Sequence, residues 1–216
     1  MSSFVIIWEQ NMYSNKKKNI AHEWPGHAAI NIGEAFEKPR VALNGNYASW
    51  LPSANIGSFG VKGFFKRNKE ASWNFSIAED IVYETYLPDH VIKLDTDAAK
   101  ENAMQAEWNA IRNKKNASYA AFRKNCSTIV SRILHAGGFY SRKWAENNNW
   151  VWAPSDIRQL ATSAGGTFMK WKDVRTILSA SGLNAADWGQ IWLARSGAFC
   201  TTGAPVYKQK EGYKVG

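Results

Sequence analysis

The order of its short apolar segments constrains this chain more than any other feature. Short segments with strand-like patterns predominate in the first half, at 4–9, 26–32, 41–51, 81–86 and 90–94, with a turn at 44–46 inside the third. Later segments show helical spacing and capping residues: 98–113, 125–138, 154–166 and 172–181. Strands mostly first and helices mostly later predict an α+β fold.

Composition supports a folded chain that contains no membrane-spanning helix. Of 216 residues, 45% are hydrophobic and 21% are charged, which excludes a largely disordered protein. No apolar run approaches the length of a membrane span, so stable membrane insertion is not expected. The lysines at 16–18 come too early for a secretory signal peptide. We expect one domain over residues 1–216, with about 167–216 as a C-terminal extension of unknown role.

A formal net charge of +9 predicts an anionic partner. Nucleic acid, an anionic membrane face and a cell-wall polymer all qualify. The densest basic runs, at 16–18, 66–69 and 112–115, lack a recognisable nucleic-acid-binding pattern with interleaved aromatic residues, so nucleic acid is not expected. The 11 tryptophans are interpreted mainly as core residues, with a stacking surface as the alternative.

Cys126 is the strongest candidate nucleophile. It begins a predicted amphipathic helix, where free N–H groups and the helix dipole stabilise an anion and therefore favour a thiolate. The same N–H groups can hold the oxyanion of an acyl-transfer intermediate. The alternative is a small, buried structural cysteine. Cys200 has no helix start and is predicted to be structural, and two cysteines with four histidines predict neither a zinc site nor a cofactor.

His27 is the best candidate for the base that a thiolate enzyme needs. Strand alternation places it with Ala29 and Asn31 on a small, polar face, and Gly26 leaves room beside it. A structural histidine is the alternative. His135 follows Cys126 by nine positions on one helix, roughly 13 Å away, which is too far for a dyad.

The other two histidines are weaker candidates, because His90 has no polar companion on its face and His22 falls in a predicted loop. A base usually needs an orienting partner. Ser49 is the first choice, because the strand that contains it is the natural neighbour of the histidine strand. Asn31 and Asn44 are the alternatives for this third position.

Two motifs carry a resemblance to a known family. Gly26–Ile32, a Gly-His-small-small-apolar strand, and Asn125–Val130, an Asn-Cys helix start, resemble the circularly permuted papain-fold hydrolases related to NlpC/P60 peptidases. The segment Tyr47–Pro52 is similar to a block in bacterial members that act as secreted toxins. The resemblance covers roughly residues 20–165. It implies an antiparallel sheet packed against helices, one of which carries the cysteine.

The resemblance implies that Cys126 is the nucleophile, His27 the base and Ser49 the third polar residue. Many relatives have His, Asn or Gln about a dozen residues after the base, where this chain has Pro39, so the match is poor at that position. The implied activity is a cysteine amidase or endopeptidase that cleaves peptidoglycan peptides. The implied biology is an antibacterial type VI secretion effector acting in the periplasm of a target cell, with a secretion carrier and an immunity protein as partners.

Two other functions stay open at this point. Permuted relatives also hydrolyse lipid esters or transfer acyl chains, although no basic amphipathic helix for membrane docking is evident in the sequence. A non-enzymatic basic binding module with an inert Cys126 is the third interpretation.

Overall fold

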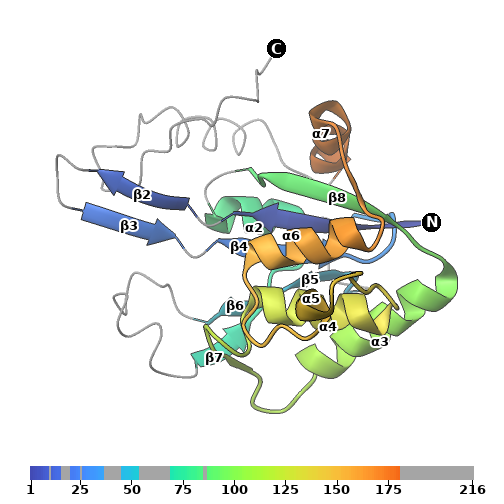
Figure 1. Cartoon of the computed structure of the whole chain (residues 1–216), viewed down its shortest axis with the longest axis horizontal. Coiled ribbons are helices and arrows are strands. Elements are labelled where there is room, and N and C mark those ends of the chain that lie inside the picture. The colour runs from blue at the N-terminus through green and yellow to red at the C-terminus, as the bar shows by residue number, and fades with distance from the viewer. Residues whose placement is uncertain are drawn as a thin grey trace.

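The computed structural model describes residues 1–9, 11–15, 20–24, 26–36, 45–53, 69–84 and 87–180. These residues form an α+β fold in which every paired strand is antiparallel (Figure 1). The strands are β1 Ser2–Trp8, β2 Asn11–Asn15, β3 Ile20–Trp24, β4 His27–Asn31, β5 Tyr47–Ser49, β6 Leu51–Pro52, β7 Lys69–Ser72, β8 His90–Asp95, β9 Ser118–Tyr119 and β10 Thr167–Phe168. The helices are α2 Ile77–Glu84, α3 Ala98–Arg112, α4 Cys126–Ala136, α5 Trp144–Asn147, α6 Pro154–Ser163 and α7 Trp171–Ala180.

The main sheet has the strand order β10-β8-β1-β4-β5. Strand β1 lies at its centre and is buried along its whole length, which explains the unbroken apolar run Phe4–Trp8 that follows its two serines. The register pairs Trp8 of β1 with His27 of β4, and Ala29 of β4 with Ser49 of β5. Paired residues project to the same face, so this register places His27, Trp8 and Ser49 on one side of the sheet.

Each face of the sheet is covered by its own hydrophobic cluster. One face packs against α3, α4 and α6, and its strand residues include Val5, Ile7, Ala28 and Ile30. The opposite face packs residues such as Ile6 and Tyr47 against Ile77 and Ile81 of α2 and Val174 and Leu178 of α7. In Figure 1, α6 crosses in front of β1 and β4, whereas α2 lies behind them. The sheet is therefore a middle layer between two sets of helices.

The strand predicted at 81–86 is wrong, because residues 77–84 form helix α2. Ile77 and Ile81 lie one helical turn apart and are both buried, as are Asp80 and Glu84. A variant of the capping box starts the helix: the Ser76 hydroxyl accepts from the Glu79 N–H at 3.3 Å, and the Glu79 carboxylate accepts at 2.7 Å from the N–H of Phe75, the residue before Ser76. Helical burial and capping override the strand propensity of the apolar residues here.

The four predicted helices are confirmed as α3, α4, α6 and α7, each within a few residues of its expected ends. Asp97 caps α3, and Asn125 caps α4. Of the predicted strand 41–51, the structure describes β5 and the start of β6; positions 41–44 lie outside the described residues, as does Cys200. The β2–β3 hairpin was not predicted, and it places His22 in a strand rather than a loop.

Part of the C-terminal segment packs on the main sheet. Strand β10 pairs with β8, and α7 contributes to the cluster over the α2 face. Residues 181–216 lie outside the described part of the chain. None of the described helices is long and apolar enough to cross a membrane.

Candidate active site

Cys126 is the first residue of α4, and its side chain is 5% exposed and forms no disulfide. The Asn125 side-chain oxygen accepts from the Thr128 N–H at 2.7 Å, and the intrahelical ladder begins with the Ile129 N–H on the Asn125 carbonyl. The N–H groups of Cys126 and Ser127 are thus left at the open end of the helix, beside the sulfur. An oxyanion formed on an acyl group attached to this sulfur would lie next to these donors.

Asn125 also holds two loops against the start of α4. Its amide nitrogen donates to the Ala121 carbonyl at 2.8 Å and to the Trp152 carbonyl at 2.7 Å. One side chain thus caps the helix and joins the 120–124 turn to the 149–153 segment. The Asn-Cys motif has a structural reason beyond its resemblance to a family, because the asparagine fixes the surroundings of the cysteine.

His27 begins β4 directly after Gly26, whose φ of 71° is a left-handed conformation that glycine adopts without a Cβ clash. The imidazole is 2% exposed and packs on the Trp8 ring with centroids 5.4 Å apart. Its Nε2 lies 3.0 Å from Ser49 Oγ and 3.2 Å from Asp80 Oδ2. The Cys126 side chain lies near the same ring, close enough for its charge to raise the pKa of His27. The structure thus brings together Cys126 and His27, 99 positions apart in the sequence.

The hydrogen-bond chemistry of Asp80 determines which imidazole nitrogen is free. A carboxylate oxygen only accepts hydrogen bonds, so the neighbouring Nε2 of His27 carries a proton and donates it. This leaves Nδ1 as the nitrogen that can take a proton from the Cys126 thiol. The arrangement matches a nucleophile–base–orienting residue relay.

Asp80 is fully buried on α2 and accepts hydrogen bonds from four side chains. Oδ2 accepts from the Tyr47 hydroxyl at 2.6 Å and from His27, and Oδ1 accepts from the Ser49 hydroxyl at 2.8 Å and the Asn74 amide at 2.7 Å. Four donors compensate the carboxylate for its lost hydration and hold it in one orientation. A carboxylate held in this way can fix the orientation of the imidazole and stabilise its protonated form.

Electrostatics favour the protonated imidazole. Burial by itself lowers the pKa of His27, but the charges of Asp80 and Cys126, with their hydrogen bonds, outweigh burial and raise the pKa well above 6.5. An imidazolium between a carboxylate and a sulfur is the charge pattern of a thiolate–imidazolium pair.

Three tyrosines near these groups are held in the neutral form. Burial, with the negative charge of Asp80, raises the pKa of Tyr47 well above 10. Burial and the charges of Glu84, Asp80 and Cys126 raise the pKa of Tyr83 to about 12, and burial with the charge of Cys126 raises that of Tyr119. The phenols therefore stay protonated at all physiological pH values, and Tyr47 donates its hydroxyl proton to Asp80.

Ser49, the residue expected at the third position, lies in the site but shares that position with Asp80. It accepts from His27 and donates to Asp80, so it bridges the two groups. Asp80 itself was missed, because it directly precedes the segment 81–86, which was predicted to be a strand, although it lies in helix α2. The Ser76-x-x-Glu79 capping box was the sequence signal that could have revealed the helix.

The other residues considered for the base and for the third position form different contacts or lie outside the described residues. Asn31 donates to the carbonyls of Gly33 and Ala35 and holds the loop after β4. His90 lies 3.4 Å from Glu9, so it does have a polar companion. His135 stacks on Tyr140 at the far end of α4. Asn44 and Pro39 lie outside the described residues.

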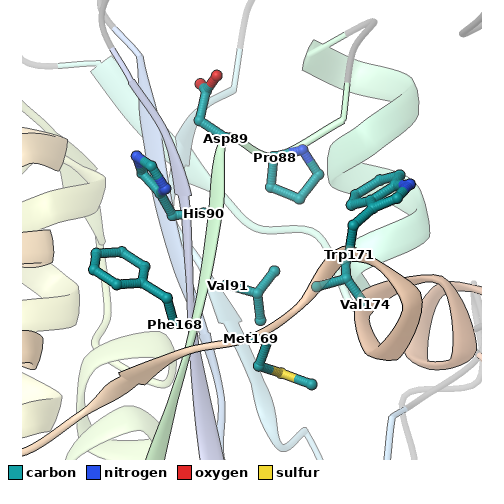
Figure 2. A pocket seen from close by; sticks show the side chains of 8 residues that line it. All are labelled: Pro88, Asp89, His90, Val91, Phe168, Met169, Trp171 and Val174. Carbon is teal, nitrogen blue, oxygen red and sulfur yellow. The ribbon is translucent and has the colours of Figure 1, made fainter. Parts of the chain in front are cut away.

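A pocket of about 230 Å³ lies away from these residues, between β8, β10 and α7. Figure 2 shows its lining: Pro88, Asp89, His90, Val91, Phe168, Met169, Trp171 and Val174. It contains none of Cys126, His27, Ser49 or Asp80. In the described part of the chain, no group of three or more His, Cys, Asp or Glu side chains is placed to hold a metal ion.

Comparison with known proteins links part of this chain to toxins. Residues 89–165 match the family described as the IcsB middle domain. The "Multifunctional-autoprocessing repeats-in-toxin" of Vibrio vulnificus is 34% identical over 70 residues, which cover 31% of this chain and 1% of the toxin. The protein with that description from Vibrio cholerae serotype O1 is 33% identical over 70 residues, covering 31% of this chain and 2% of the toxin.

The chain thus spans a very small part of these relatives. No solved structure matches it. The segment 89–165 includes Cys126 and its helix, whereas His27, Ser49 and Asp80 precede it. The family match therefore includes the candidate nucleophile, and the rest of the site is supported by its geometry alone.

Proposed function

We propose that this protein is a cysteine-dependent acyl-transfer enzyme with a toxin-like role, in which Cys126 is the nucleophile, His27 the general base and Asp80 the residue that orients the base. One observation carries the proposal: the imidazole that a fully buried carboxylate holds also lies within electrostatic reach of the Cys126 side chain. A cysteine with only a packing role needs neither group. The order of histidine strand before cysteine helix also agrees with the permuted papain-like fold, which remains part of the proposal.

The first half of the reaction follows from the geometry. His27 takes the thiol proton, and the thiolate attacks the acyl carbonyl carbon, whose oxygen becomes an oxyanion beside the N–H groups of Cys126 and Ser127. The intermediate collapses, the bond to the leaving group breaks, and the His27 imidazolium gives its proton to that group. A thioester on Cys126 and a free leaving group result.

The burial of the site favours a second half in which the acyl group passes to an acceptor other than water. Cys126 and His27 are 5% and 2% exposed, so bulk water has little access to a thioester formed there. This supports an acyltransferase, for which a lipid ester can be the acyl donor, as the best interpretation. An acceptor amine or hydroxyl would lose its proton to His27 and take the acyl carbon from the sulfur.

Cleavage of peptidoglycan peptides is the second candidate. The +9 charge supports it, because peptidoglycan is anionic, and the similarity to toxins agrees with an antibacterial effector. In this mechanism water attacks the thioester and releases the peptide acid. A secretion carrier and an immunity protein belong to this candidate, and they remain predictions.

Mass spectrometry of the intact protein tests the proposal. The protein is incubated with fatty acyl thioesters, phospholipid vesicles or purified sacculi, and a hydroxylamine-sensitive acyl adduct is sought on Cys126. We expect an adduct in the wild type and none in Cys126→Ala. Adducts from acyl thioesters or lipids favour the first candidate, and released muropeptides favour the second. No adduct and no product from any of the three substrates would contradict the proposal.

A further inference from the structure

Exposed apolar side chains gather at the tips of the two loops that Asn125 holds beside the nucleophile. Trp150 is 89% exposed and Val151 is 50% exposed in the 149–153 segment, and Phe122 is 51% exposed in the 120–124 turn. Their chain neighbours Ala121 and Trp152 both bond to the Asn125 amide, so the two tips flank the same end of α4. Trp152, in contrast, is buried, as a core residue is.

The charged residues of these two loops are all cations, and they lie in the 120–124 turn. Arg123 and Lys124 directly follow Phe122 and are exposed. Neither 117–125 nor 148–153 contains an Asp or Glu. Large apolar side chains flanked by cations, on a chain of net charge +9, form the combination that binds the interface of an anionic bilayer.

We propose that the 120–124 turn and the 149–153 segment dock on an anionic membrane surface, with Trp150, Val151 and Phe122 in the headgroup–acyl boundary and Arg123 and Lys124 on the lipid phosphates. Binding to the membrane does not depend on catalysis. The consequence for the reaction, that docking brings a lipid-borne acyl chain to Cys126, rests on the proposed function.

A glycan is the other ligand that stacks on exposed aromatic rings. The chemistry of these tips favours lipid, because Phe122 and Val151 have no polar group to pair with sugar hydroxyls. Trp150 suits the interface in particular, since its ring is apolar and its indole N–H can bond a headgroup.

Co-sedimentation with vesicles tests the proposal. Full-length protein is mixed with phosphatidylcholine vesicles that contain about one third phosphatidylglycerol, or with pure phosphatidylcholine. The wild type should bind the anionic vesicles and show weaker binding as salt is raised. Phe122→Ser with Trp150→Ala should weaken the binding about tenfold or more. Arg123→Gln with Lys124→Gln should remove the preference for anionic lipid.

The matched control is Phe168→Ser with Val82→Ser, which removes two exposed apolar side chains outside the proposed docking surface. Phe168 is 52% exposed on β10, the edge strand of the main sheet farthest from β5, and Val82 is 57% exposed on α2. The control should bind as the wild type does. The proposal would be overturned if the control variant lost as much vesicle binding as Phe122→Ser with Trp150→Ala does. It would also be overturned if the wild type did not bind anionic vesicles, or bound only sacculi. An acyl adduct on Cys126 without vesicle binding would reject the docking surface and leave the proposed function intact.

Discussion

The two faces of β4 are both buried, yet they differ in chemistry. Ala28 and Ile30 project toward α4 and α6 and contact only a hydrophobic cluster. His27 projects to the other side, where Ser49, Tyr47 and Asp80 form a hydrogen-bonded network inside an apolar layer. Burying charged groups costs free energy unless they are paired. The difference indicates that one face mainly stabilises the fold, whereas the other holds the polar residues of the candidate site.

Removal of the sulfur should separate the two roles most sharply. Cys126→Ala should lower activity by roughly 10⁴-fold or more, since no other group can form the thioester. Its free energy of unfolding should fall by only about 1–2 kcal/mol, because little side-chain volume is lost although a charge beside His27 is removed. Steady-state kinetics and urea unfolding measure the two effects. A variant that keeps full activity would rule out the thioester mechanism.

Asp80→Asn should affect both activity and stability. Asparagine keeps the shape but no longer stabilises the imidazolium, so we expect activity to fall by about 10²- to 10⁴-fold. The network loses a buried charge pair, which typically costs about 3–5 kcal/mol. Asp95→Asn, at an exposed position, is the control and should change neither quantity. Wild-type kinetics in Asp80→Asn would show that Ser49 alone orients the base.

Ile30→Ala tests the apolar face. Deleting a fully buried isoleucine should lower the free energy of unfolding by about 2–5 kcal/mol. The folded enzyme should keep its kcat when it is assayed well below its melting temperature. A large loss of kcat in fully folded protein would mean that the two faces are coupled, contrary to the comparison.

Stability should also depend on pH through the polar face. His27 has a raised pKa in the folded state, so its stabilising contribution is complete below its unfolded pKa of about 6.5 and is lost as pH rises through the folded value. Denaturant unfolding from pH 6 upward should therefore show a decline in stability that His27→Gln removes. Identical pH profiles for wild type and variant would contradict the raised pKa.

Ser49→Ala should have the smallest effect. Asp80 keeps its bonds from His27, Tyr47 and Asn74, so the base stays oriented and we expect a loss of about 1 kcal/mol in stability and a few-fold loss in kcat. A loss as large as that of Asp80→Asn would assign the orienting role to the serine.

Sequence reasoning could find the parts of the site that depend on local signals. The Asn125 cap and the apolar spacing behind it predict a helix that starts at Cys126, and strand alternation places His27 on a polar face. Asp80 escaped this reasoning because α2 is only eight residues long and its isoleucines also suit a strand. Its approach to His27 depends on tertiary packing of α2 on the sheet, which no local pattern specifies.

The central claim is that one imidazole couples Cys126 to Asp80, and an NMR titration of the His27 ring tests it most directly. The ring nitrogen shifts are followed against pH in the wild type, in Cys126→Ala and in Asp80→Asn. We predict a wild-type pKa well above 6.5 and a lower value in each variant, because each removes a charge that holds the proton. A wild-type His27 pKa near 6.5, or a pKa that stays the same in Cys126→Ala, would contradict the account.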